Sequence, residues 1–159
     1  MQAEPPIALD TLTLRPVGAD NWRDVADLAP RADQLDFVPA LAARYLLLQV
    51  YGTTWHCLGA FAGETAVAHV MWGVDDDNSR WIGGLLVDAR HQGRGVGRRV
   101  LELLVEQLCA QPDRGPVRLS HHPDNAAGRS LFEALGFVPT GAHEDGEVVM
   151  ELDEARPLS

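Results

Sequence analysis

The stretch Gln92-Gly93-Arg94-Gly95-Val96-Gly97 follows the apolar run 85–87 and precedes a segment, 96–110, whose apolar residues have helical spacing. This order predicts a strand, a tight glycine turn and a helix. Glycine allows the sharp turn and a close approach of the backbone to a ligand. The first N–H groups of the helix lack intrahelical acceptors, so together with the helix dipole they favour an anion such as a pyrophosphate. Two further arginines, Arg98 and Arg99, add positive charge at this end.

Two common nucleotide-binding motifs do not fit this stretch. A P-loop requires a lysine after its second glycine, and all thirteen basic residues of the chain are arginine. A Rossmann fingerprint has the spacing G-x-G-x-x-G and is followed by a second strand that ends in an acidic residue. The spacing here is Q-x-x-G-x-G, so a site for ATP or NAD is disfavoured.

Length and composition indicate one globular domain in the cytoplasm. The 159 residues are 46% hydrophobic, which argues for a sizeable core and against disorder. No run of about 18 apolar residues predicts a membrane span, and 1–6 lack the parts of a signal peptide. Cys57 and Cys109 are far apart in the sequence, which predicts neither a metal site nor a disulfide framework.

The net charge of −10 restricts the partners. Nucleic acid is disfavoured because its binding needs a basic face. A cationic partner such as a small amine or polyamine is favoured, and solubility alone is the other explanation of the charge.

Hydrophobic periodicity and turn residues predict seven strands and four helices. We expect the strands at 11–17, 55–62, 65–74, 80–87, 115–120, 137–140 and 147–152, and the helices at 20–29, 39–48, 96–110 and 123–135. Gly83-Gly84 inside a strand predicts a bulge or a close backbone approach. No repeat or linker is visible, so 1–159 is predicted to be a single domain with a core at 11–152 and flexible ends at 1–10 and 153–159.

Two motifs in the second half resemble those of the GNAT acetyltransferase superfamily. The first, L-L-V-D-x-x-x-Q-G-R-G-V-G at 85–97, contains a match to its acyl-CoA loop, (Q or R)-x-x-G-x-(G or A). The second, N-A-A-G-R-S-L-F-E-A-L-G-F at 125–137, is close to the superfamily pattern N-x-x-A-x-x-L-Y-E-x-L-G-F. Within the superfamily, D-N-W at 20–22 and T-G-x-x-x-D-G-E-V-V-M at 140–150 look most like bacterial diamine or polyamine (spermidine/spermine-type) N-acetyltransferases.

The resemblance implies an α/β (α+β) fold with a mixed, mostly antiparallel sheet of about seven strands and about four flanking helices. The strand that ends at Val87 and the strand at 117–120 would run parallel and splay apart, and the pantetheine of acetyl-CoA would enter the gap between them. It also implies a small amine substrate, and a homodimer is expected because dimerisation is common among relatives. The charge, the absence of a long apolar run and the cysteine spacing predict no nucleic acid, membrane or metal partner.

The cofactor-binding residues follow from the same resemblance. Backbone groups of 85–87 would bind the pantetheine, the N–H groups of 93–98 would bind the pyrophosphate, and Asn125 would contact acetyl-CoA from the other side. The full set of expected cofactor-binding residues is Leu85, Leu86, Val87, Gln92, Gly93, Arg94, Gly95, Val96, Gly97, Arg98, Asn125, Gly128 and Phe132.

Direct acetyl transfer to an amine needs a donor to the oxyanion and a proton for the departing thiolate. We predict the backbone N–H of Leu86 as the oxyanion donor. The superfamily commonly supplies the proton from the tyrosine of L-Y-E, where this chain has Phe132, which cannot donate. The remaining explanations are another donor, an unassisted thiolate, or a protein that binds acyl-CoA without turnover. The candidate donors are His121, which lies nearest by this reasoning, and Cys109, His122, Tyr45 and Tyr51.

The expected acceptor-binding site lacks the acidic side chains that polyamine-type relatives often carry on the central strand, because this chain has Gly83-Gly84 at those positions. The expected acceptor residues are Asp36, Phe37, Tyr45, Asp75 and Asp76, with 144–147 as a further acidic segment. His69 is either a base or a core residue. The sequence thus predicts an acetyl-CoA-dependent N-acetyltransferase that acts on a primary amine of a small cationic, polyamine-like acceptor in a ternary complex. The alternatives are a weak or silent acyl-CoA-binding module, or an acetyltransferase for an aminoglycoside, a peptide or a protein N-terminus.

Overall fold

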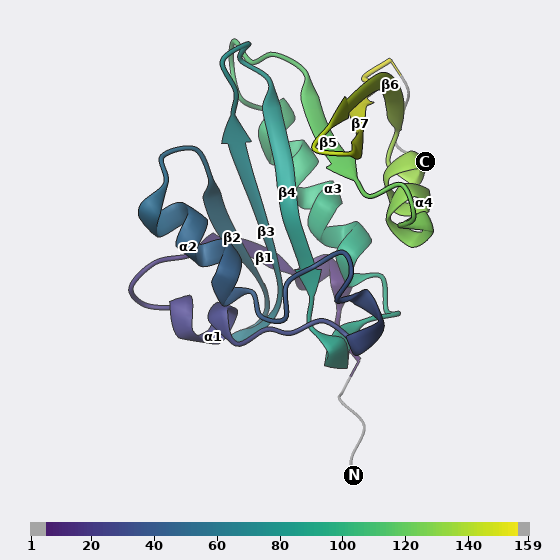
Figure 1. Ribbon diagram of the computed structural model, residues 1–159. Coiled ribbons are helices and arrows are strands. Elements are labelled where there is room, and N and C mark those ends of the chain that lie inside the picture. The colour runs from purple at the N-terminus through teal and green to yellow at the C-terminus, as the bar shows by residue number, and fades with distance from the viewer. Residues whose placement is uncertain (1–5, 156–159) are drawn as a thin grey trace.

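A seven-stranded sheet forms the centre of the computed structural model, which describes residues 6–155 (Figure 1). Its strand order is β1-β2-β3-β4-β5-β7-β6. The strands are β1 (Thr13–Pro16), β2 (His56–Ala62), β3 (Thr65–Val74), β4 (Arg80–Val87), β5 (Val117–His121), β6 (Phe137–Glu144) and β7 (Glu147–Leu152). Neighbouring strands pair antiparallel except β4 and β5, which are parallel. The mixed, mostly antiparallel sheet predicted from the resemblance is therefore confirmed.

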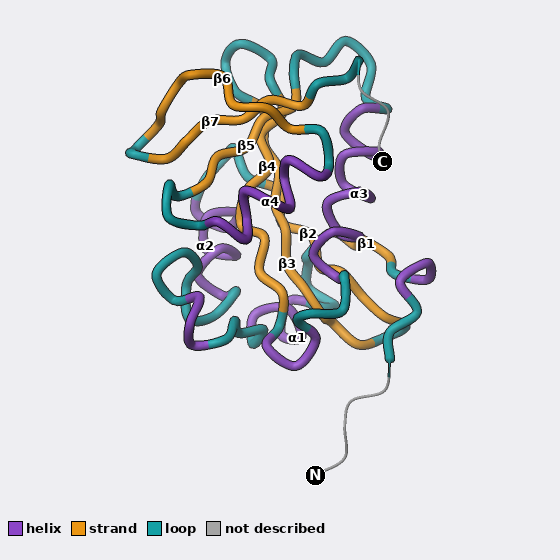
Figure 2. Tube along the Cα trace, turned by 90° about the vertical axis from the view of Figure 1, so that its right-hand side faces the viewer, coloured by secondary structure: helices purple, strands orange, loops and turns teal. Residues whose placement is uncertain are grey.

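Helices cover both faces of the sheet. They are α1 (Trp22–Ala26), α2 (Ala43–Tyr51), α3 (Val96–Cys109) and α4 (Ala126–Ala134), with the short 3-10 helices η1 (Leu9–Thr11), η2 (Ala32–Gln34) and η3 (Ala89–His91). In Figure 2 the sheet lies between α2 and α3. The buried face of α3 packs on β-strand residues such as Leu58 and Val70, whereas α1 and α2 pack on the opposite face, against Cys57 and Met71. Two hydrophobic layers thus fix the sheet in position.

The parallel strands β4 and β5 separate early. Their pairing is confined to Arg80 with Val117 and Trp81 with Arg118, the first two residues of each strand. Beyond these pairs the strands diverge (Figure 1). The predicted splay is confirmed, and it leaves one edge of β4 without a neighbouring strand.

A bulge interrupts β4 beside this splay. Met71 lies opposite Gly83 and His69 lies opposite Leu86, so two residues of β4, 84 and 85, face the single residue between them on β3. Gly84 has φ +62°, in the left-handed region that favours glycine. The bulge predicted at Gly83-Gly84 is thus present, at the second glycine.

Three helices, α1, α2 and α4, begin later than the sequence predicts, and bonds in the structure account for the first two. Oδ1 of Asn21, the N-cap residue, accepts from the N–H of Gly18 (2.9 Å) and so does not cap α1, which begins at Trp22 instead of Asp20. The N–H of Ala42 donates to the carbonyl of Leu28 (2.9 Å), which ties this segment to α1 and delays α2. A local turn bond therefore sets the start of α1, and a tertiary bond sets the start of α2, against local propensity.

The chain ends are described only in part, since 1–5 and 156–159 lie outside the described residues. Ile7 and Leu9, within the segment 1–10 predicted to be flexible, pack against the main core. The N–H of Asp153 donates to the carbonyl of Gly136 (2.9 Å). No helix within 6–155 has the length and apolar character needed to cross a membrane.

Candidate functional site

A cavity of about 510 Å³ lies where β4 and β5 diverge. Aromatic side chains from five parts of the chain line it, together with acidic residues from two turns. The aromatic residues are Phe37, Tyr45, Trp55, Trp81 and Phe132, and the acidic residues are Asp75, Glu144, Asp145 and Glu147. Such a lining suits a ligand that is cationic at one end and partly apolar.

The bulge decides which backbone N–H of β4 faces the gap. The N–H of Asp88 donates to the carbonyl of Val67 (3.0 Å). Opposite pairs in an antiparallel ladder alternate between bonded and non-bonded, so His69 and Leu86, two residues further along, form a bonded pair. The N–H of Leu86 therefore points at β3. The prediction that it stabilises the oxyanion is wrong for this reason.

The N–H that the bulge releases belongs to Leu85. The carbonyl of Gly84 accepts a hydrogen bond from Nδ1 of His69 (2.7 Å), whose ring stacks on Tyr45 on the α2 face of the sheet. In a trans peptide the C=O and the following N–H point in opposite directions, so the N–H of Leu85 points away from His69. Leu85 lines the cavity. The sequence shows two glycines but does not show which peptide the bulge turns, so the direction of the Leu85 N–H could not be predicted from it.

The glycine loop reaches the N-terminus of α3 as the sequence predicts. Gly93 and Gly95 have φ values of +75° and +81°, and Gly95 is the N-cap residue of the helix. The N–H of Arg99 donates to the carbonyl of Gly95 (3.1 Å), so the N–H groups of 96–98 precede the first intrahelical donor. Val96 is buried in the core and holds the helix start beside β4. The loop thus offers backbone donors at the positive end of a 14-residue helix.

The side chain of Gln92 fastens the loop to the end of β4. Its Nε2 donates to the carbonyl of Val87 (2.9 Å) and to Oε1 of Gln34 (2.6 Å). Gln34 was missed by the sequence analysis because it lies in η2, far from any motif. Among residues 6–155, the lining of the cavity includes none of 92–98, so loop and cavity are separate parts of one site that β4 connects.

The second motif forms the start of α4. Asn125 lines the cavity and caps this helix, with its Oδ1 accepting from the N–H of Gly128 (3.0 Å). A Cβ at position 128 would lie 2.6 Å from Nδ2 of Asn125, so glycine makes room for the cap. Phe132, one turn further on, reaches the cavity, whereas Gly128 does not line it.

The candidate proton donors separate clearly in space. Tyr45, His121 and His122 line the cavity, whereas Cys109 and Tyr51 do not. Sγ of Cys109 lies 3.9 Å from Oε1 of Glu154, and Tyr51 is 85% exposed. His121 is buried, and its ring centroid lies 6.2 Å from that of Phe132. The carbonyl of His122 can only accept, so Nδ1 of His121 donates to it (2.9 Å) and holds the one hydrogen of the neutral ring. Nε2 therefore carries a proton only when the ring is cationic. Burial and the charge of Glu147 raise the pKa of Tyr45 to about 12.

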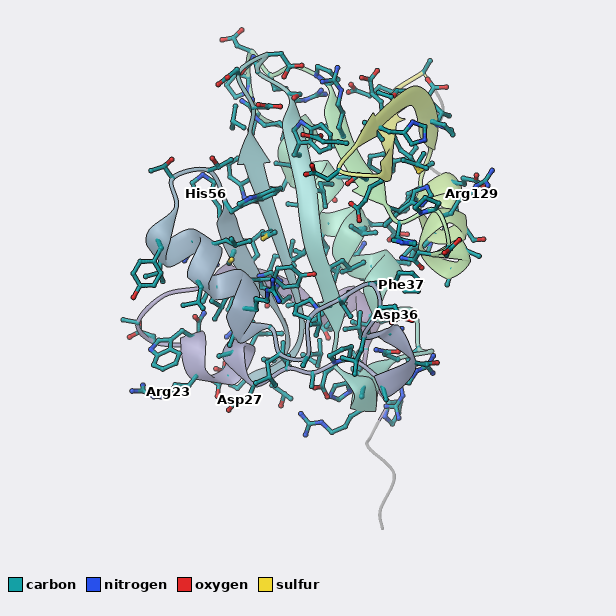
Figure 3. The ribbon with its side chains drawn as sticks, viewed as in Figure 1. Arg23, Asp27, Asp36, Phe37, His56 and Arg129 are labelled. Carbon is teal, nitrogen blue, oxygen red and sulfur yellow. The ribbon has the colours of Figure 1, made fainter. Side chains whose placement is uncertain are left out.

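The acceptor end of the cavity is acidic. Oε1 of Glu147 accepts from Oγ of Ser120 (2.7 Å), which fixes this carboxylate at the start of β7. Asp75 lines the cavity, but Asp36 and Asp76 are exposed and do not. Figure 3 shows Asp36 beside Phe37 on the loop between η2 and α2. Of the predicted acceptor residues, the structure therefore brings together Phe37, Tyr45 and Asp75.

The charge of Asp77, in the same turn as Asp75, is already balanced by an ion pair with Arg118. Hydrogen bonds from Ser79 and from Arg118 (2.6 Å) lower the pKa of this carboxyl to about 2. Trp55 and Trp81, which were not singled out from the sequence, line the cavity, and Nε1 of Trp81 donates to Oγ of Ser79 (3.0 Å) in this turn.

Burial of His69 makes the stability of the fold depend on pH. Burial lowers the pKa of His69 from 6.5 to about 4. Between these values the unfolded chain binds a proton that the folded chain does not, so stability present above about pH 6.5 is lost as the pH falls. From about pH 7 to about pH 5, the free energy of unfolding should fall by about 2 kcal/mol more in the wild type than in His69→Asn. Urea titrations measure this difference; equal falls would contradict it.

Comparisons with known proteins agree with this geometry. The model of the acetyltransferase (GNAT) family matches residues 22–137. Spermine/spermidine N(1)-acetyltransferase of Bacillus subtilis (strain 168) is 24% identical over 149 residues, which are 88% of this chain and 97% of that protein. Mycothiol acetyltransferase of Clavibacter sepedonicus is 30% identical over 119 residues, 75% of this chain and 34% of that protein. A solved structure of aminoglycoside acetyltransferase AAC(6')-Ib in complex with coenzyme A has a TM-score of 0.72 at 18% identity and covers 91% of this chain and 96% of that one.

Proposed function

Because the chain belongs to the acetyltransferase (GNAT) family, we propose that it transfers the acetyl group of acetyl-CoA to a primary amine of a small cationic acceptor. The observation that carries the proposal is the cavity at the β4–β5 splay, which has a backbone donor in its wall and acidic groups at one end. The thioester and the amine would meet there, in a ternary complex.

The residues present fit acetyl-CoA. The N–H groups of 96–98 and the charge of Arg94 suit the pyrophosphate, and the unpaired edge of β4 at 85–87 suits the pantetheine. Asn125 and Phe132 face the same cavity from α4. When bound, acetyl-CoA supplies the activated acetyl group. Solved GNAT structures with coenzyme A or acetyl-CoA bound support this assignment.

Three groups of the chain carry the chemistry in this proposal. The N–H of Leu85 donates to the acetyl carbonyl and stabilises the negative charge that develops on its oxygen. His121, when cationic, supplies the proton for the thiolate, and the carboxylate of Glu147 holds the ammonium form of a second amine on the acceptor. The aromatic rings of Trp55 and Trp81 accommodate the aliphatic segments.

A polyamine is the acceptor that we favour, and the Bacillus spermine/spermidine N(1)-acetyltransferase supports this choice. The test measures release of coenzyme A as free thiol with diamines, polyamines, aminoglycosides, amino acids and peptides as acceptors. The highest kcat/KM is expected for a polyamine. Turnover that is highest with an aminoglycoside would identify a larger acceptor instead. Release at background with every amine, despite acetyl-CoA binding, would favour the silent module that Phe132 suggests.

Glu147→Gln is expected to raise KM for the polyamine about tenfold, because an amide keeps the bond to Ser120 but loses the charge–charge attraction to the ammonium group. kcat should change much less. Glu151→Gln is the matched control, since Glu151 lies on the same strand, bonds Arg118 (3.0 Å) and does not line the cavity. Equal KM values for the two variants would remove Glu147 from the acceptor site. Homodimer formation, the cytoplasmic location and the domain boundaries 1–159 stay predictions.

A further inference from the structure

We propose that His69 is a positioning residue for acetyl transfer, which acts by holding the carbonyl of Gly84 so that the N–H of Leu85 faces the acetyl group. The inference rests on the proposed function and adds to it a residue that no motif of the sequence marks. It concerns a side chain on the opposite face of the sheet from the glycine loop.

The contact between His69 and the bulge is close. Nδ1 of His69 lies 2.7 Å from the carbonyl oxygen of Gly84, and the ring is fully buried. A Cβ at Gly84 would lie 3.0 Å from Cε1 of His69, so the ring packs directly on the bulge. On its other side the ring stacks on Tyr45, with the centroids 5.1 Å apart and the planes within 6°. The imidazole is thus fixed between α2 and β4.

The bulge itself explains why a side chain is needed. Two residues of β4, 84 and 85, oppose one residue of β3, so the peptide between them is the extra one in the ladder. Its carbonyl lacks a ladder partner, and a carbonyl shielded from water without a donor is costly. Nδ1 of His69 supplies that donor. It also prevents the peptide between Gly84 and Leu85 from rotating, and such a rotation would turn the N–H of Leu85 away from the cavity.

The surroundings of His69 favour a donor over a base. Nε2 is buried and has no hydrogen-bond partner among residues 6–155. His69 does not line the cavity, so the amine would meet Tyr45 before it reached this nitrogen. Because burial lowers the pKa of the ring to about 4, the imidazole is neutral at physiological pH, with its one hydrogen on Nδ1. A neutral, fixed donor matches a positioning role.

Two substitutions of His69 test the proposal. His69→Leu removes the donor, whereas His69→Asn keeps an N–H close to the position of Nδ1. We expect kcat to fall about 30-fold in His69→Leu and to recover to within about threefold of the wild type in His69→Asn. The Kd for acetyl-CoA and the KM of the amine should stay within about twofold. His56→Leu, at an exposed histidine of β2 outside the cavity (Figure 3), is the matched control.

The outcomes are distinct. Wild-type kcat in folded His69→Leu would overturn the proposal. Equal loss in both His69 variants would also overturn it, because it would show that histidine itself, as a base, is required. Should His69→Leu fail to fold, His69→Asn decides through its kcat and the pH dependence of that kcat. A pH dependence that matches the wild type supports the positioning role. Loss of an ionisation from it contradicts that role.

A second measurement does not depend on turnover. The infrared C=O stretch of bound acetyl-CoA, labelled with carbon-13 at the carbonyl, should lie below that of free acetyl-CoA in the wild type and in His69→Asn. In His69→Leu the shift should be lost. A shift that persists in His69→Leu refutes the role of His69 even in a protein without turnover, whereas missing turnover with a normal infrared pattern refutes the proposed function alone.

Discussion

Gly95→Val is expected to weaken the binding of acetyl-CoA about 100-fold, which corresponds to the loss of about two charge-assisted hydrogen bonds. Gly95 has φ +81°, a conformation that a β-branched residue adopts only with strain. An added Cβ would also lie 3.1 Å from Cδ1 of Leu9. The loop must therefore change its path, and the N–H groups at 96–98 no longer converge on one phosphate. Isothermal titration calorimetry measures the change.

Gly63→Val provides the matched control. Gly63 also has a positive φ, +62°, in the turn between β2 and β3, and a Cβ there would meet no atom within 4 Å. Both variants carry the strain of valine in the left-handed region, but only Gly95 belongs to the loop. Loss of stability in both with loss of affinity in Gly95→Val alone is the expected pattern. Unchanged affinity in Gly95→Val would remove the phosphate site from the loop.

Phe132→Tyr is expected to raise kcat about 100-fold, the lower end of what a general acid contributes, because His121 can donate from Nε2 only as a cation, whereas a tyrosine hydroxyl donates in its neutral form. Phe132 faces the cavity from α4 beside the buried ring of His121, so an added hydroxyl would lie within the site. Acetyl-CoA affinity should stay nearly constant because the hydroxyl acts only as the thiolate leaves. Steady-state kinetics with the best acceptor and calorimetry with acetyl-CoA measure the two effects.

Phe132→Leu separates the hydroxyl from the packing of the ring, and it should not raise kcat. An unchanged kcat in Phe132→Tyr would show that proton transfer does not limit the reaction or that His121 already supplies the proton. A His121→Gln variant distinguishes these two cases, because kcat falls only if His121 is the donor.

The sequence predicted the parts of the site that depend on local pattern. The glycine loop and α3 follow from apolar spacing and from glycines that need positive φ values at 93 and 95. The end of the central strand and the start of α4 were found in the same way. Each of these elements is specified within about 15 residues of chain, so no knowledge of tertiary contacts was required.

The N–H that the proposed oxyanion donor would use could not be predicted, because its direction depends on the register between two strands. The one extra residue at the bulge reverses which backbone N–H groups point toward β3 after it. The N–H of Leu85, and not that of Leu86, therefore faces the gap. The bond from His69 to Gly84 joins residues 15 positions apart and has no sequence pattern. Likewise, Asp36 was a reasonable acidic candidate by sequence, but its loop leaves it exposed while the ring of Phe37 contacts His122 (5.3 Å between centroids).

The acidic groups of the cavity lie on two turns, the one after β3 and the one between β6 and β7. The loop and the bulge that would hold the thioester are instead anchored in the core. Turn residues tolerate substitution far better than core residues. Selection can therefore exchange one acceptor for another by changes in these turns without disturbing the acyl donor. Because the two parts of the site lie on different elements, single surface substitutions can change the acceptor while the same fold keeps its acyl donor.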